Sequence, residues 1–308
     1  TMGVVQEDRV AYIAPNTHAQ LESFYAVPQI GAVLVPVNFR LSADDFVYIV
    51  NHSGAKVLCV HADQLDVVDR VRDRLPEVQR FIALEGARDG WEDYEALVAA
   101  ASPEFTRPEI AESDLLTINY TSGTTARPKG VMITHRNAYM NSVGTLLHLR
   151  MDLGDRYLWT LPMFHANGWT YTWTVTAAGA THVCLPVMDP ARVFELLRKE
   201  QITWLCAAPT VLIMLSNASG ADGGQVPTGV HVVTAGASPA AETIERLEDD
   251  LGWTITHVYG LTETTPFITV CEQRPEHKDL SVRERATHKA RQGVELITSG
   301  ELCVMDTE

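Results

Sequence analysis

The sequence has little positive charge. It contains 24 lysines and arginines against 39 aspartates and glutamates, which gives a formal net charge of −15 over 308 residues. Nucleic-acid surfaces and sites for anionic membranes need the opposite balance, so we expect no nucleic-acid partner. Long apolar runs are also missing. The most apolar stretch, residues 168–186, is interrupted by polar residues, glycine and proline, so we expect no membrane span.

Cysteine is scarce and carries no metal or disulfide pattern. The five cysteines are odd in number and widely spaced, and no CxxC or Cys/His spacing suggests a zinc site. They lie mostly in apolar runs such as "KVLCV". We therefore expect reduced thiols and a cytoplasmic protein.

Helix-like and strand-like segments alternate along the chain. Continuous apolar strands separated by amphipathic segments predict an α/β fold with mostly parallel sheets covered by helices on both faces. The alternation runs through two halves with a seam near residue 150. We predict two α/β subdomains, at 1–150 and 151–292.

Three local patterns give sharper expectations. Ser42 followed by Asp45 predicts a capping box that opens a helix. The apolar spacing of residues 64–75 predicts one amphipathic helix. Residues 272–292 are charged and mixed, and we expect a loop there.

The stretch "YTSGTTARPKG", residues 120–130, lies between two strand-like runs. Gly123 and Gly130 give conformational freedom, hydroxyls and backbone N–H groups give donors, and Lys129 gives a mobile charge. This combination suits a polyphosphate. A Walker loop would read GxxxxGK[ST] and enter a helix, whereas this lysine follows a proline and precedes a strand. We predict a hairpin-like flap over phosphates; the alternative is a flexible polar turn.

Four motifs in order carry a family resemblance. They are the loop at 120–130, "LPMFHANGW" at 161–169, "TAGASP" at 234–239 and "YGLTETTP" at 259–266. Together they resemble the adenylate-forming superfamily of acyl-CoA synthetases, luciferases and adenylation domains, and most closely the fatty-acid-type acyl-CoA synthetases. The resemblance implies two similar, mostly parallel sheets in a layered arrangement, followed by a β-barrel subdomain that would begin at 293–308.

The resemblance also implies an activity. Its members join a carboxylate to the α-phosphate of ATP, release pyrophosphate, and pass the acyl group to coenzyme A. Bringing two anions together calls for charge neutralisation and in-line positioning.

The family's site residues map onto matching positions. Tyr259 and Gly260 would face adenine, Thr262 would bond the α-phosphate, and Glu263 would hold Mg²⁺ with Thr121. Taken alone, Glu263 is more readily interpreted as an exposed turn acid. The β- and γ-phosphates would be held by Thr121, Ser122, Gly123, Thr124, Thr125 and Lys129, and the opposite adenine wall would be Gly236, Ala237 and Ser238.

His165 and Trp169 would contact the acid. In this position amino-acid-activating relatives carry an aspartate, so "FH" favours a carboxylic acid without an α-amine. Trp169 resembles the aromatic gate of fatty-acid-activating members. The structural alternatives are a packed or surface histidine and a core tryptophan.

Two departures from the family pattern stand out. Ala126 replaces a glycine of the loop, which would cost about 1 kcal/mol if the backbone there needs positive φ. The ribose-binding aspartate, the hinge and the C-terminal lobe with its lysine do not appear before Glu308.

We therefore expect the N-terminal large lobe of a longer ligase. The alternatives are a nucleotide-binding module without turnover and an acyl-AMP ligase serving a carrier protein. By analogy with larger members, the lobe would form a homodimer.

Overall fold

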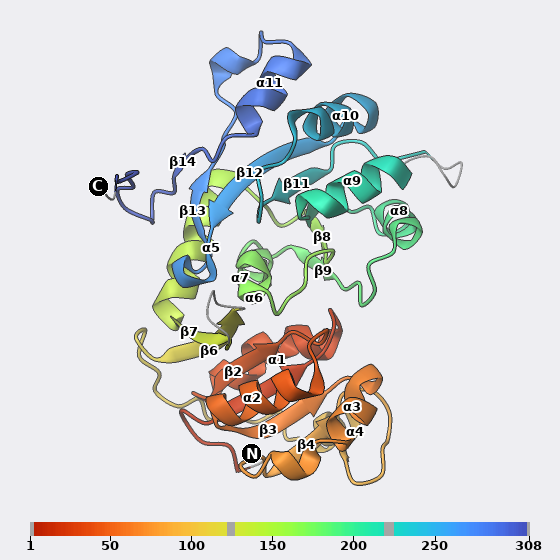
Figure 1. Cartoon of the computed structure of the whole chain (residues 1–308), viewed down its shortest axis with the longest axis vertical. Helices are drawn as coiled ribbons and strands as arrows, with labels where there is room; N and C mark the ends of the chain where they lie inside the picture. The colour runs from red at the N-terminus through yellow and green to blue at the C-terminus, as the bar shows by residue number, and fades with distance from the viewer. Residues whose placement is uncertain (1–2, 122–126, 219–224, 307–308) are drawn as a thin grey trace. The chain divides into compact units, whose positions relative to one another are not determined.

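The computed structural model describes residues 3–121, 127–218 and 225–306. The chain divides into two compact units (Figure 1). The first unit is Thr1–Ala138 with Met163–Asn167, and the second is Tyr139–Pro162 with Gly168–Glu308. The subdomain limits expected at 150 and 292 stay a prediction.

The first unit is built on a seven-stranded sheet in the order β5-β4-β3-β1-β2-β6-β7. All neighbours are parallel except β6 and β7, which form an antiparallel pair. The elements are β1 (Arg9–Ile13), α1 (His18–Gln29), β2 (Val33–Val37), α2 (Ala43–Ser53), β3 (Ala55–Val60), α3 (Leu65–Asp69), β4 (Arg80–Ala83), β5 (Glu92–Asp93), α4 (Tyr94–Ala100), β6 (Leu115–Thr121) and β7 (Lys129–Thr134). Helix α5 (His135–Leu149) follows β7 and continues into the second unit.

The central strands explain why the sequence folds this way. Every residue of β2, "VLVPV", is buried, as expected for a parallel strand covered on both faces. Helix α2 begins at the predicted capping box, in which the Ser42 hydroxyl accepts from the Asp45 N–H and the Asp45 side chain accepts from the Ser42 N–H. That prediction is confirmed.

The second unit carries another seven-stranded sheet in the order β14-β13-β12-β11-β10-β8-β9. Its strands are parallel from β9 to β12, and β13 pairs antiparallel with both β12 and β14. The elements are β8 (Arg156–Leu158), α6 (Ala166–Trp169, which straddles the two units), α7 (Tyr171–Ala177), β9 (Thr181–Val183), α8 (Pro190–Lys199), β10 (Trp204–Cys206), α9 (Pro209–Ala218), β11 (His231–Thr234), α10 (Ala241–Leu251), β12 (Thr254–Gly260), β13 (Phe267–Val270), α11 (Val282–Lys289) and β14 (Val294–Glu295).

The two sheets confirm the predicted fold class. Each unit has its own buried apolar cluster, formed where helices pack on a sheet face. In the second unit α8 and α10 contribute Phe194, Leu197 and Leu247 to this cluster, and β11 contributes Val232.

Two local predictions were wrong. Residues 64–75 form α3 and a separate 3₁₀ turn, η2 (Arg72–Arg74), instead of one helix. Three valines, Val67, Val68 and Val71, lower the helix propensity of this segment because branching at Cβ restricts their rotamers.

The segment 272–292 is not a loop. It contains a 3₁₀ turn, η4 (Pro275–His277), and helix α11. Ser281 and Glu284 form a second capping box at the start of α11, and Ala286 is buried in the apolar cluster of the unit. The S-x-x-E spacing was readable in the sequence, but the high charge around it concealed the helix.

The state of the cysteines and the length of the helices can be read from the described residues. Cys59, Cys184, Cys206, Cys271 and Cys303 all lie in the described part of the chain and all are free thiols. Among the helices described in the structure, none is both long and apolar enough to cross a membrane.

Candidate functional site

The predicted phosphate loop joins the two strands of a hairpin. β6 and β7 are antiparallel, and their last pair is Thr121 with Lys129. The strands expected on both sides of the loop are thus confirmed as an antiparallel pair, while the flap over phosphates stays a prediction. Lys129 is exposed, and no ion pair to it is found within the described residues. Ser122, Gly123, Thr124 and Thr125, together with Ala126, lie outside the described residues.

The hairpin is tied to helix α2. The Tyr48 hydroxyl donates to the Pro128 carbonyl at 3.1 Å, and the Tyr120 hydroxyl lies 2.8 Å from Nδ1 of His52. These contacts fix the strand ends on either side of the loop. Lys129, which follows Pro128 directly, therefore starts from a backbone of defined position.

The motif "FHANGW" adopts an unusual backbone. Gly168 and its neighbours Ala166, Asn167, Trp169 and Thr170 all have positive φ, between 39° and 66°. Side chains disfavour this conformation by about 1 kcal/mol or more per residue, and glycine alone adopts it freely. The chain here makes a left-handed turn that other contacts must hold.

Buried amides hold this turn in the first unit. Nδ2 of Asn167 donates to the Thr117 hydroxyl at 2.8 Å and to Oδ1 of Asn119 at 3.1 Å. In return, Nδ2 of Asn119 donates to Oδ1 of Asn167 at 3.1 Å and to the Phe164 carbonyl at 3.2 Å. Asn167 and Thr117 are fully buried and Asn119 is 2% exposed. The hydrogen bonds therefore form away from water, where they are costly to lose.

The sequence analysis missed Asn119 and Asn167. The signal was an amide inside the apolar strand "LLTINY", since a buried amide needs partners. The amides bring the strand that enters the phosphate loop and the segment that carries His165 into contact.

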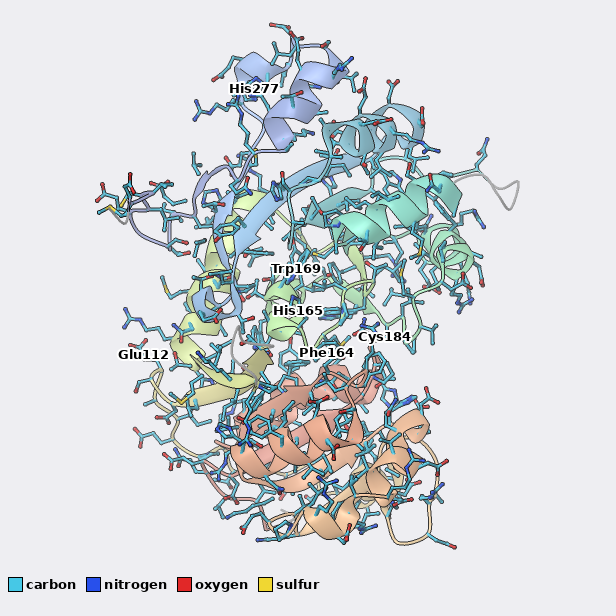
Figure 2. All side chains as sticks on the ribbon, viewed as in Figure 1. Glu112, Phe164, His165, Trp169, Cys184 and His277 are labelled. Carbon is cyan, nitrogen blue, oxygen red and sulfur yellow. The ribbon has the colours of Figure 1, made fainter. Side chains whose placement is uncertain are left out.

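His165 lies at the start of the turn (Figure 2). Its side chain is partly open to solvent, yet the protein crowds the imidazole, and this desolvation lowers the pKa of His165 below its ordinary value. Desolvation thus favours the neutral form of the ring. The preceding Phe164 makes an edge contact with Phe39, with ring centroids 5.8 Å apart.

Trp169 belongs to the second unit and is 5% exposed. Its ring contacts Phe267 of β13 edge-on, with centroids 6.1 Å apart. The Thr170 hydroxyl is buried 3.2 Å from that of Ser142. A buried tryptophan of this kind is compatible both with the predicted gate and with a core residue.

The two remaining motifs meet at one edge of the second sheet. β11 and β12 are neighbouring parallel strands with Thr234 opposite His257. Gly236, Ala237 and Ser238 follow the carboxyl end of β11, while Tyr259 and Gly260 end β12. Segments after the carboxyl ends of adjacent parallel strands share one edge, where α/β sheets bind ligands. The structure therefore brings the predicted adenine wall and Tyr259 to the same edge.

The geometry of this edge depends on two glycines. Gly236 has a φ of 89°, and a Cβ there would face open space. A Cβ on Gly260 would come within 1.8 Å of the Pro266 carbonyl oxygen, so no side chain fits. The Ser238 hydroxyl donates to the Ala290 carbonyl at 2.7 Å, which ties the first turn to the end of α11.

The acidic turn follows directly. Thr262, Glu263 and Thr264 form a 3₁₀ turn, η3, in which the Thr264 hydroxyl accepts from the Leu261 N–H at 2.8 Å. Tyr259 is 38% exposed. Glu263 is exposed, and none of the ion pairs found in the described part of the chain involves it. A ring and a carboxylate are thus presented to solvent from one short segment.

The predicted metal ligands belong to different units, Thr121 to the first and Glu263 to the second. Within the described residues, no group of three or more His, Cys, Asp or Glu side chains could hold a metal ion. A single carboxylate still suits Mg²⁺, which commonly binds through one or two carboxylates together with substrate phosphates.

Comparison with known proteins identifies the family of this chain. The model of the family described as "AMP-binding enzyme" matches residues 1–308. The chain belongs to the AMP-binding enzyme family. This confirms the resemblance to adenylate-forming enzymes.

Several members of the AMP-binding family are similar over the whole chain. A 4-hydroxybutyrate–CoA ligase of Metallosphaera sedula is 40% identical over 99% of this chain, and a 2-methylpropanoate–CoA ligase of Humulus lupulus is 35% identical over 99%. The chain spans 57% of the length of each of these ligases.

Solved structures of the family have the same fold. The N-terminal domain of FACL13 from Mycobacterium tuberculosis superposes with a TM-score of 0.80 at 27% identity, covering 88% of this chain and 67% of that one. A long-chain-fatty-acid–CoA ligase from Archaeoglobus fulgidus reaches 0.83 at 22% identity, over 96% of this chain and 58% of that one. At that identity, the second likeness concerns the fold alone.

Proposed function

We propose that the protein takes part in the ATP-dependent activation of a carboxylic acid to an acyl-adenylate and then to an acyl-CoA thioester. The observation that carries the proposal is family membership over all 308 residues, with both similar relatives being CoA ligases. The shared sheet edge that carries Gly236 and Tyr259 supports a nucleotide site there.

The proposed roles follow the motifs. Tyr259 and Gly260 lie against adenine opposite Gly236, Ala237 and Ser238, and Thr262 bonds the α-phosphate. Lys129 supplies a mobile positive charge to the β- and γ-phosphates, beside the hydroxyls of the loop that begins at Thr121. By the family resemblance, Glu263 would be the carboxylate ligand of Mg²⁺ and Thr121 the second ligand, and bound Mg²⁺ would neutralise phosphate charge.

The acid is proposed to be apolar and to lack an α-amine. By the resemblance, His165 takes the position that borders the reacting carboxylate, where amino-acid-activating relatives carry an aspartate, and its lowered pKa favours the uncharged ring. A neutral imidazole can donate one hydrogen bond to a carboxylate without trapping it as an ion pair, which leaves that oxygen free to attack the α-phosphorus. A neutral imidazole offers an ammonium group one hydrogen-bond acceptor but no negative charge to pair with, unlike an aspartate.

The first experiment is ATP–pyrophosphate exchange with a panel of acids. It would contain 4-hydroxybutyrate, 2-methylpropanoate, butyrate and a longer fatty acid, followed by a coenzyme A assay. We expect exchange that depends on the acid. ATP binding without exchange for any acid would favour a nucleotide-binding module, and acyl-adenylate without thioester would favour an acyl-AMP ligase serving a carrier protein.

The second experiment isolates the loop. Lys129→Ala should weaken ATP binding about tenfold or more, because a charge-assisted phosphate contact is lost, and should leave acid binding nearly unchanged. Lys199→Ala is the matched control, since Lys199 is an exposed lysine on α8 outside the motifs. Unchanged ATP affinity in Lys129→Ala would remove the loop from the proposal.

A further inference from the structure

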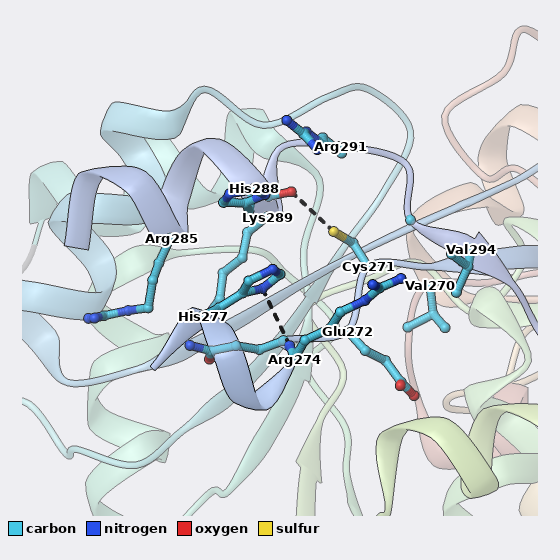
Figure 3. A pocket seen from close by; sticks show the side chains of 12 residues that line it. Val270, Cys271, Glu272, Arg274, His277, Arg285, His288, Lys289, Arg291 and Val294 are labelled. Atoms are coloured by element: carbon cyan, nitrogen blue, oxygen red, sulfur yellow. Dashed lines mark hydrogen bonds between the residues drawn. The ribbon is translucent and has the colours of Figure 1, made fainter. Parts of the chain in front are cut away.

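A polar pocket lies in the second unit, outside the four motifs. It has a volume of about 400 Å³ and is bordered by the end of β13, the turn η4, helix α11 and the strand β14 (Figure 3). Small-molecule pockets span roughly 300 to 1,000 Å³, so it has room for a small organic or inorganic ligand.

Basic side chains dominate its lining. They come from three segments, and they are Arg274, His277, Arg285, His288, Lys289 and Arg291. The single lining carboxylate, Glu272, turns away from the pocket and pairs with Nδ1 of His148 at 2.7 Å. The pocket is thus cationic in a chain whose net charge is −15.

Three of these charges are not neutralised by a close carboxylate. Arg291 is exposed and has no ion pair within the described residues, and Arg285 donates to a neutral acceptor, the Leu280 carbonyl, at 2.7 Å. Arg274 reaches Glu276 only at 3.9 Å. Lys289 differs, because it is buried and paired with Glu248, so it serves the packing of α11 on α10.

Backbone carbonyl oxygens near the pocket would repel an anion, but three of them already accept hydrogen bonds. The carbonyl of His288 accepts from the Cys271 thiol at 3.2 Å, that of Ala290 from Ser238, and that of Arg291 lies 2.8 Å from Nδ1 of His257. Basic side chains at the end of α11 and just after it therefore line the pocket, while these three carbonyl oxygens are occupied.

The frame of the pocket is held before any ligand arrives. The rings of His277 and His288 stack with centroids 4.6 Å apart and join η4 to α11. The capping box of Ser281 and Glu284 fixes the start of α11. Guanidinium groups on such a frame match phosphate oxygens in geometry and charge.

We propose that this pocket binds a phosphate-bearing small molecule with at least two negative charges, at a site separate from the nucleotide edge. The shared chemistry is a diphosphate group, which could belong to free pyrophosphate or to a nucleotide. The proposal stands on the pocket itself and does not depend on the function proposed above.

Cys271 provides a reporter inside the pocket. We would measure alkylation of each cysteine by iodoacetamide, using peptide mass spectrometry, with pyrophosphate as the probe and without Mg²⁺. At ten times its Kd, pyrophosphate should slow Cys271 alkylation about tenfold by occupancy. Half-buried Cys184 and exposed Cys303 should be unaffected. Equal slowing of all three thiols, or equal slowing by sulfate at matched ionic strength, would overturn the proposal.

Variants and a second probe complete the test. Arg291→Gln should abolish the protection, while Arg283→Gln should keep it, because Arg283 is an exposed arginine of α11 that does not line the pocket. Protection that survives Arg291→Gln would overturn the proposal.

Protection by both ADP and pyrophosphate would identify the diphosphate group as the ligand, and protection by ADP alone would identify a nucleotide. Lys129→Ala should not alter the protection of Cys271. A failure of the proposal for the loop can therefore be told apart from a failure of the proposal for this pocket.

Discussion

The two units hold their site turns by different means. The left-handed turn at 166–170 begins in the first unit and ends in the second; it contains four non-glycine residues and is held from the first unit by the buried amides of Asn119 and Asn167. In the second unit the turn after β12 depends on the missing Cβ of Gly260, which lets the backbone approach Pro266. One turn is held by hydrogen bonds and the other by the absence of a side chain.

This difference determines how each turn should fail. A steric requirement is absolute, because a backbone atom cannot yield to an added methyl group. A hydrogen-bonded turn loses stability in steps, as each partner is removed. The predictions below test that contrast, starting with the steric case.

Gly260→Ala should have the largest effect, destabilising the second unit by more than about 3 kcal/mol through backbone overpacking. Urea unfolding followed by tryptophan fluorescence measures this, since five of the six tryptophans lie in that unit. Gly236→Ala is the matched control. Its Cβ meets open space, so it should cost only about 1 kcal/mol for positive φ. Similar losses in both variants would refute the steric account.

Asn167→Ala should come next, with a loss of about 2–3 kcal/mol in the first unit, because Thr117 and Asn119 lose buried partners. Hydrogen exchange of peptides from β6 and from 163–167 would report the local opening. Asn167→Gly keeps the left-handed backbone but not the amide, so it should be less damaging by about 1 kcal/mol. If glycine fully restored stability, backbone conformation and not the amide pair would hold the turn.

The same contrast separates the features that could be predicted from the sequence from those that could not. The capping box at Ser42 and the buried strand β2 could be predicted because neighbours in the chain determine them. The order of the four motifs led to the family. The amide pair could not be predicted, since Asn119 and Asn167 are 48 residues apart and only the folded chain brings them together.

The two misread segments have different causes. The valines of residues 64–75 fit the helical spacing but weaken a continuous helix. The charges of α11 concealed its capping box, and burial of Lys289 against Glu248 shows that one of those charges is internal. The roles of individual site residues stay predictions, because they depend on ligands and on residues 122–126.

The stability of the second unit should also depend on pH, whereas the contribution of the amide pair should not. Burial lowers the pKa of His182 to about 4, and its Nδ1 accepts from the indole N–H of Trp159 at 3.0 Å. The unfolded chain takes up this proton near pH 6.5, so stability should fall as pH drops from 6.5 toward 4, by about 2 kcal/mol after allowing for partial exposure. Urea unfolding at pH 7, 5.5 and 4.5 tests this. His182→Gln should flatten the profile, and an unchanged slope in that variant would assign the pH effect to other groups.

The smallest expected change in stability discriminates best, because the same substitution, threonine to valine, should stabilise one unit and destabilise the other. Thr234, at the end of β11, is fully buried, and its hydroxyl has no partner among the described residues. Thr117 is equally buried, but its hydroxyl donates to Asn119 and accepts from Asn167. Thr234→Val should therefore stabilise the second unit by about 1 kcal/mol, whereas Thr117→Val should destabilise the first by about 1–2 kcal/mol. Urea unfolding of both variants measures these changes. A loss of stability in Thr234→Val would mean that the Thr234 hydroxyl has a hydrogen-bond partner. The contrast between the hydrogen-bonded turn at 166–170 and the edge of the second sheet would then fail.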